Sequence, residues 1–115
     1  MVKKDYVPDR GDLVWLNFTP QAGHEQMGRR PAFVLSPKEY NRKTNLFIVC
    51  PITSHKKGYP FEVAIEAKKI GGMALSDQVK SLDWTVREVE FIEKGKVHVL
   101  AAVMDNIKAL LLVEE

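Results

Sequence analysis

Apolar residues occur in short runs separated by glycine and proline, a pattern that is typical of β strands joined by turns. Aromatic and β-branched residues, which favour strands, dominate these runs. The segments that we interpret as strands are residues 13–18, 32–36, 46–53, 61–66 and 79–84. Pro37 follows the second segment and predicts a short helical turn over residues 38–41.

Two prolines and one long loop modify this interpretation. Pro31 lacks an N–H and therefore fits the first position of the strand at residues 32–36. Pro51 interrupts residues 46–53, the most apolar segment, which we place centrally in a sheet. We expect a bulge or an unpaired edge at Pro51. Residues 19–30 form a long loop, and loops of this length are usually functional or disordered.

After residue 95 the apolar residues recur at intervals of three and four, which indicates an amphipathic helix. The residues with this spacing are Leu100, Val103, Met104, Ile107, Leu110 and Leu111. Five or more antiparallel strands followed by one C-terminal helix predict a mainly β fold, a small barrel closed or capped by that helix.

Length and composition narrow the class of protein. With 115 residues we expect a single domain, residues 1–115, and the 45% of hydrophobic residues excludes a wholly disordered chain. No apolar run reaches the roughly 20 residues that cross a bilayer, and the N-terminus lacks the apolar segment of a secretory signal. We therefore expect a cytoplasmic protein with no membrane contact. The lone Cys50 agrees, because it offers no disulfide framework.

The distribution of charge is more informative than its total. There are 17 Lys and Arg against 15 Asp and Glu, a formal net charge of +2, which argues against a protein that simply coats polyanions. Basic residues gather at positions 29–30, 38–43, 56–57 and 68–69, whereas many acidic residues lie after position 82. This asymmetry allows a local positive surface on a nearly neutral protein.

The sequence offers no familiar metal or nucleotide motif. His24, His55 and His98 are scattered, and a single cysteine leaves no ligand cluster with tetrahedral spacing. Neither a glycine-rich phosphate loop nor a serine nucleophile elbow is present in the sequence. A catalytic site would therefore use acid, base and guanidinium groups, with no metal and no cofactor.

Residues 23–31 concentrate such groups. Glu25 is suited to abstract a proton, and Arg30 is suited to pair with a phosphate through its planar two-donor fork. The alternative is that Glu25 and Arg30 form an ordinary exposed ion pair, which is common. Thr53, at the end of the most apolar strand, either presents its hydroxyl to a ligand or caps a turn.

Several sequence blocks occur together, in order, between Tyr6 and Trp84. They are Tyr6-Val7-Pro8-Asp9, residues 11–15, Gly23 with Glu25-Gln26 and Gly28, Arg30-Pro31-Ala32, residues 34–37, Tyr40-Asn41 with Lys43-Thr44, Pro51-Ile52-Thr53, residues 57–63, Ala74-Leu75 and residues 77–81. In this combination they resemble the MazF/PemK family of bacterial toxins, and within it the MazF branch. Members of this family are sequence-specific endoribonucleases of toxin–antitoxin pairs.

The resemblance implies a plugged SH3-like β-barrel that works as a homodimer and cuts single-stranded RNA without metal. In the family's mechanism the ribose 2′-OH attacks the adjacent phosphorus and leaves a 2′,3′-cyclic phosphate and a 5′-hydroxyl. Carried over by position, Glu25 becomes the candidate base, Arg30 stabilises the phosphorane, and Thr53 hydrogen-bonds the scissile phosphate. It also implies a cognate antitoxin, acidic and partly disordered.

The resemblance and the residue chemistry together predict an RNA-binding set. Bases need faces on which to stack and phosphates need cations, and Asp77 and Gln78 are suited to reading base edges. Asn17 and Arg29 depart from residues common in the family. The predicted set is Asn17, Phe18, His24, Arg29, Lys56, Lys57, Tyr59, Asp77, Gln78 and Lys80.

Two alternatives of a different class stay open at this point. One is a non-enzymatic toxin on the same barrel that poisons gyrase, as CcdB does. This alternative would place its functional determinants at the end of the terminal helix. The other is an RNA-binding barrel without catalysis.

Overall fold

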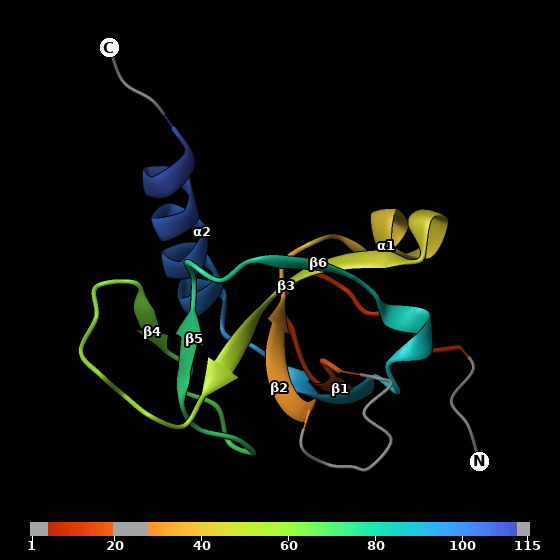
Figure 1. The fold of residues 1–115 in the computed structure, drawn as a ribbon, viewed down its shortest axis with the longest axis horizontal. Coiled ribbons are helices and arrows are strands. Elements are labelled where there is room, and N and C mark those ends of the chain that lie inside the picture. Colours follow the sequence, from red (N-terminus) through yellow and green to blue (C-terminus); the bar gives the residue numbers. More distant parts are fainter. Residues whose placement is uncertain (1–4, 20–27, 113–115) are drawn as a thin grey trace.

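β3 (Leu46–Thr53) is the longest strand and crosses the middle of the sheet (Figure 1). The computed structural model describes residues 5–19 and 28–112. The other elements, in chain order, are β1 (Asp12–Asn17), β2 (Arg29–Val34), α1 (Lys38–Thr44), β4 (Glu62–Ala64), β5 (Met73–Leu75), β6 (Lys80–Asp83), the 3-10 helix η3 (Trp84–Val86), β7 (Glu90–Lys94) and α2 (Val97–Leu111).

β3 changes its partner along one edge. Its first half, residues 46–49, pairs with β6, and its last two residues, Ile52 and Thr53, pair with β5. On the other edge Ala32 to Val34 of β2 face Pro51 to Val49 of β3. β4 extends the sheet beyond β5, while β1 and β7 extend it beyond β2, and every pairing is antiparallel.

The expectation of an unpaired edge at Pro51 is confirmed. Leu35 N donates to Ile48 O of β3, so the N–H groups of alternate residues of β3 face β2 and that of Pro51 would face the other edge. Pro51 falls between the β6-paired and β5-paired parts of β3 and belongs to neither pairing. The missing N–H therefore leaves no ladder bond unmade.

The expectation that Pro31 opens its strand is wrong. β2 begins at Arg29, and Pro31 is its third residue, opposite Trp15 of β1. Pairing with β1 runs on to Asn17 and Arg29, whereas pairing with β3 stops at Ala32. The physical reason is that the nitrogen of Pro31 lies on the β3 side, where it has no hydrogen to donate.

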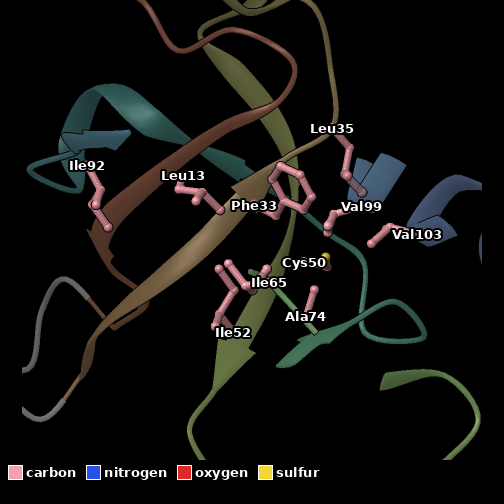
Figure 2. Close-up of a cluster of buried hydrophobic side chains, with 10 residues drawn as sticks. All are labelled: Leu13, Phe33, Leu35, Cys50, Ile52, Ile65, Ala74, Ile92, Val99 and Val103. Carbon is pink, nitrogen blue, oxygen red and sulfur yellow. The ribbon is translucent and has the colours of Figure 1, made fainter. Parts of the chain in front are cut away.

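The sheet buries apolar side chains on both faces, because neighbouring residues of a strand point to opposite sides. On one face Leu13, Phe33 and Cys50 pack with Val99 and Val103 of α2 (Figure 2). The opposite face carries a second cluster, Val14, Leu16, Ala32, Val34, Phe47 and Val49. Cys50 is fully buried, and this burial raises the pKa of its thiol to about 12, with a smaller contribution from the negative charge of Asp77.

A mainly β fold with a C-terminal helix is confirmed, but closure of the barrel is not shown. Among the described strands, β7 pairs only with β1 and β6 only with β3. Between β6 and β7 the chain passes through η3, and the Arg87 guanidinium donates to the carbonyls of Asn17 (3.1 Å) and Phe18 (2.9 Å). Together with the backbone bond from Asn17 N to Arg87 O at 3.0 Å, these side-chain bonds connect the segment after η3 to the end of β1.

The helices differ somewhat from their predicted extents, and two short strands, β5 and β7, were not predicted. The helical turn expected at residues 38–41 continues to Thr44, and its Asn41 is fully buried with Nδ2 bonded to Pro8 O at 2.7 Å and Ser36 O at 3.0 Å. β7 buries only Ile92, so its sequence carries little apolar signal. No helix in the described ranges is long and apolar enough to cross a membrane.

Candidate functional site

Arg30 and Thr53 lie where β2 and β3 part. Extending the pairing of Ala32 with Pro51 by two residues brings Arg30 opposite Thr53, on the same side of the sheet. Because the pairing of β2 with β3 stops at Ala32, the ladder between the two strands does not reach Arg30 and Thr53, and two hollows of about 490 and 250 Å³ lie beside them. Both hollows are lined by Arg30 and Thr53 together.

The Thr53 side chain takes part in a local turn and keeps a donor. Its Oγ1 accepts the backbone N–H of His55 at 3.1 Å, which is the turn cap expected as one alternative. A threonine hydroxyl has one hydrogen to donate as well as two lone pairs. Thr53 therefore retains a hydroxyl hydrogen that it can donate to a ligand in the hollows that it lines.

The segment that carries Glu25 and His24 lies outside the described residues. The chain enters and leaves it beside Arg30, because Phe18 N donates to Gly28 O at 2.7 Å. A Cβ on Gly28 would overlap the side chain of Thr19, so glycine at position 28 allows these two residues to approach closely.

Arg29 is held by its neighbours. Its guanidinium meets Glu90 Oε1 at 3.0 Å, the carbonyl of Glu88 at 3.0 Å and Asn17 Oδ1 at 3.2 Å. These contacts join β1, β2 and β7 at the edge of the 490 Å³ hollow, which Arg29 also lines. Glu90 therefore offsets the positive charge that Arg29 was expected to add, and Arg30 is the more exposed of the two cations.

A third hollow, of about 150 Å³, adjoins the other two at Thr53. It has an aromatic wall, a cation and two side chains that can read base edges. Tyr59 is 62% exposed at its rim. The lining residues of this hollow are Thr53, His55, Lys57, Tyr59, Phe61, Glu62, Leu75, Asp77 and Gln78.

The structure brings most of the predicted RNA-binding residues together. Lys57, Tyr59, Asp77 and Gln78 line the 150 Å³ hollow, and Phe18, Gln78 and Lys80 line the 250 Å³ hollow. Asn17 contacts Arg29 instead of lining any of the three hollows, and exposed Lys56 does not line them either. In the described ranges no group of three or more His, Cys, Asp or Glu is arranged to hold a metal ion.

Three residues that shape the site were not predicted. Glu62 accepts the N–H groups of Lys57 and Gly58 at 3.0 to 3.2 Å and so orders the loop before β4. Gly72, with φ of +121°, passes against the Thr53 carbonyl, and Ser76 anchors the chain just before Asp77. Only Gly72 gave a usable sequence signal, as part of the pair Gly71-Gly72.

Comparison with known proteins shows which family this chain resembles. A family model described as the PemK-like, MazF-like toxin of type II toxin-antitoxin systems matches residues 9–111. The endoribonuclease toxin MazF of Escherichia coli (strain K12) is 54% identical over 71% of this chain and 74% of its own length. The endoribonuclease PemK of Escherichia coli is 28% identical over 96% of this chain and 87% of its own length.

Solved structures agree with the sequence comparisons. MazF (Form-I) from Deinococcus radiodurans superposes with a TM-score of 0.84 at 56% identity, covering 93% of this chain and 98% of that one. MazE-MazF (Form-II) from the same organism gives 0.84 at 48% identity, covering 96% and 100%. The chain therefore belongs to the PemK/MazF family of toxins of type II toxin-antitoxin systems.

Proposed function

We propose that this protein is a toxin endoribonuclease that cuts single-stranded RNA, chiefly messenger RNA, at specific sequences and so stops translation and growth. The observation that carries the proposal is the convergence of Arg30 and Thr53 on two shared hollows, with the RNA-binding candidates around them. The relatives named above are endoribonucleases, which supports the same activity here. A gyrase-poisoning toxin, or a barrel that binds RNA without cutting it, is not favoured.

The proposed reaction is an internal transfer at phosphorus. The 2′-oxygen of the substrate ribose forms a bond to phosphorus, and the bond from phosphorus to the 5′-oxygen breaks. The proton of the 2′-OH passes to a base, for which Glu25 is the candidate, and a proton is delivered to the departing 5′-oxygen. The products are a 2′,3′-cyclic phosphate and a 5′-hydroxyl, so atoms and charge balance without a metal or cofactor.

Arg30 and Thr53 have separate parts in this reaction. A guanidinium is a poor proton donor at neutral pH, so Arg30 acts by stabilising the negative charge of the phosphorane. Its planar fork donates two hydrogen bonds to phosphate oxygens. The Thr53 hydroxyl, whose oxygen already accepts from His55 N, donates its hydrogen to the scissile phosphate.

RNA specificity arises in the hollows on either side of Thr53. Lys57 and Lys80 contact phosphates, and exposed Tyr59 provides a face on which an unstacked base can lie. Asp77 and Gln78 present hydrogen-bonding groups to base edges. His24, Asn17, Phe18, Arg29 and Lys56 complete the proposed RNA-binding set.

We also propose two protein partners. One is a cognate antitoxin with an acidic, partly disordered segment, in line with the MazE-MazF complexes among the structural neighbours. The other is a second copy of this chain in a cytoplasmic homodimer. An apolar groove of about 440 Å³ supports the homodimer, because its walls include exposed apolar side chains, among them Tyr40, Val79 and Leu111.

The activity is tested with purified protein and a long single-stranded RNA in the presence of EDTA. We expect discrete fragments whose 5′ ends accept phosphate from a kinase directly and whose 3′ ends can be extended only after the cyclic phosphate has been opened and the phosphate removed. Fragments with 3′-hydroxyl ends, or cleavage that disappears with EDTA, would contradict the proposal. The Arg30→Ala variant is the negative control for a contaminating ribonuclease.

A further inference from the structure

Ser76 connects the C-terminal helix to the site. It is fully buried, and its Oγ donates to Phe61 O at 2.6 Å while accepting from Asn106 Nδ2 of α2 at 3.0 Å. The Ser76 N–H also donates to Phe61 O, at 3.1 Å. Both hydrogen-bond donors of Ser76, its N–H and its O–H, therefore converge on one carbonyl, and Asn106 holds the hydroxyl in place.

The two loops that wall the 150 Å³ hollow meet at this point. After Ser76 come Asp77 and Gln78, and Gln78 N donates back to Leu75 O at 3.0 Å. After Phe61 comes Glu62, whose carboxylate accepts the N–H groups of Lys57 and Gly58. Glu62 thus holds the loop with Lys57 and Gly58 through its side chain. Phe61 holds the loop that follows Ser76 through its backbone carbonyl.

We infer that Asn106 is a positioning residue for RNA specificity. Through Ser76 and Phe61 it sets the distance between the loop with Lys57 and Tyr59 and the loop with Asp77 and Gln78. That distance decides which base the hollow accepts. The inference rests on the proposed function, since it concerns the substrate of the same site.

The physical reason is the steep dependence of hydrogen bonds on geometry. A side chain that reads a base edge must lie within about 3.2 Å of it, with a nearly straight donor angle. A shift of one loop against the other by less than an ångström therefore weakens the hydrogen bonds to the correct base more than those to an incorrect base. Arg30 and Thr53 lie on β2 and β3, whereas the hydrogen bond of Asn106 goes to Ser76, beyond the end of β5, so we expect Asn106 to act on the two loops more than on these residues.

The test compares Asn106→Asp with wild-type protein. Aspartate has the same size but no hydrogen to donate to Ser76 Oγ, whose own hydrogen already goes to Phe61 O. The control is Asp105→Ala, one residue away and exposed on the same helix. Cleavage is measured on a preferred RNA site and on its single-base variants, giving kcat and KM for each.

We expect the preference of Asn106→Asp for its best site to fall roughly fivefold, the factor that corresponds to about one hydrogen bond. KM should change while kcat stays near that of wild type, and Asp105→Ala should keep the full preference. Ser76→Ala, which keeps the volume but lacks the hydroxyl, should give the same loss. An unchanged preference in both variants would overturn the inference.

Amide hydrogen exchange gives a readout that does not need cleavage. In Asn106→Asp we expect faster exchange at Gln78 and at Lys57 and Gly58, with unchanged exchange in β2. Absence of cleavage by wild-type protein would contradict the proposed function, whereas unchanged exchange in the two loops would contradict the role of Asn106 by itself.

Discussion

The backbone of Gly72 passes so close to the carbonyl of Thr53 that a Cβ at position 72 would overlap it. Gly72 also has φ of +121°, a conformation that residues with a side chain rarely adopt. Its carbonyl accepts the Ile65 N–H at 3.0 Å, so the segment cannot simply move away. Gly72, in the connection between β4 and β5, therefore fixes the end of β3 and, with it, the Thr53 hydroxyl.

Replacing Gly72 by alanine should both destabilise the protein and lower cleavage. We expect a loss of about 1–3 kcal/mol in the free energy of unfolding, from the strained φ and the overlap with Thr53. Gly71→Ala is the matched control, because a Cβ there meets no atom within 4 Å. Urea unfolding and single-turnover cleavage of both variants provide the measurement, and equal behaviour of the two would contradict this prediction.

Arg30 and its neighbour Arg29 should differ sharply when each is replaced by alanine. Loss of the group that stabilises the developing charge should lower kcat of Arg30→Ala by about 10²- to 10³-fold. Arg29→Ala should act mainly on KM and stability, because its guanidinium is bound to Glu90 and Asn17. Single-turnover kinetics on one RNA separate the effects. An equally large kcat defect in Arg29→Ala would show that the assignment is wrong.

Cys50 should be inert in the folded protein. Burial raises the pKa of its thiol to about 12, so almost none of it is thiolate at pH 8, and only the thiolate reacts. We expect no reaction with a chromogenic disulfide reagent at pH 8 until denaturant unfolds the chain. Thiol release during urea unfolding should follow the loss of circular dichroism. Prompt labelling in native buffer would argue against the buried placement.

Glu93 should make the protein sensitive to acid. Its carboxylate accepts the backbone N–H groups of Lys68 (3.1 Å) and Lys69 (2.7 Å), and these bonds lower its pKa below the usual 4.5. A lowered folded-state pKa stabilises the protein above the unfolded-state value, and this stability is lost as pH falls through the folded-state value.

The stability of Glu93→Gln should accordingly depend less on pH below about 4.5. Urea midpoints measured between neutral and strongly acidic pH test this, with Glu39→Gln, exposed on α1, as the control. If wild type and Glu93→Gln lose stability in parallel as pH falls, the bonds from Lys68 and Lys69 do not have this effect.

A charge in the apolar groove should separate the proposed homodimer. Val79 lines the groove and is 41% exposed, so Val79→Asp places a carboxylate against the partner's apolar surface. We expect a monomer by sedimentation equilibrium at a concentration where wild type is dimeric. Val97→Asp, at the 82% exposed start of α2 and outside the groove, should stay dimeric. If Val79→Asp remains dimeric, the dimer interface does not lie at this groove.

The fold was predictable where the sequence pattern is strong. β3 has apolar residues on both faces and α2 repeats them at helical spacing, so both were placed from sequence. β5 was missed because it has only three residues, and β7 was missed because it lies at the sheet edge and buries only Ile92. Pro31 was misplaced because a proline can sit inside a strand wherever its nitrogen faces away from a paired neighbour.

The site was predictable only in part. Arg30 and Thr53 drew attention as residue types, but sequence chemistry alone left each with an ordinary structural alternative. The contact of Asn106 with Ser76 and the pairing of Arg29 with Glu90 join positions far apart in the chain. No local pattern predicts such contacts, since they depend on how α2 and β7 pack against the sheet.

The change of partner at Pro51 has a consequence for how this protein can diverge. Because β6 and β5 share one edge of β3 but are separated there by Cys50 and by Pro51, which has no N–H, neither pairing extends into the other. Substitutions that reshape β6 and the surface beside it can accumulate while β5 and Gly72 keep Thr53 in place. The surface around β6 and the placement of Thr53 can therefore change independently of each other during evolution.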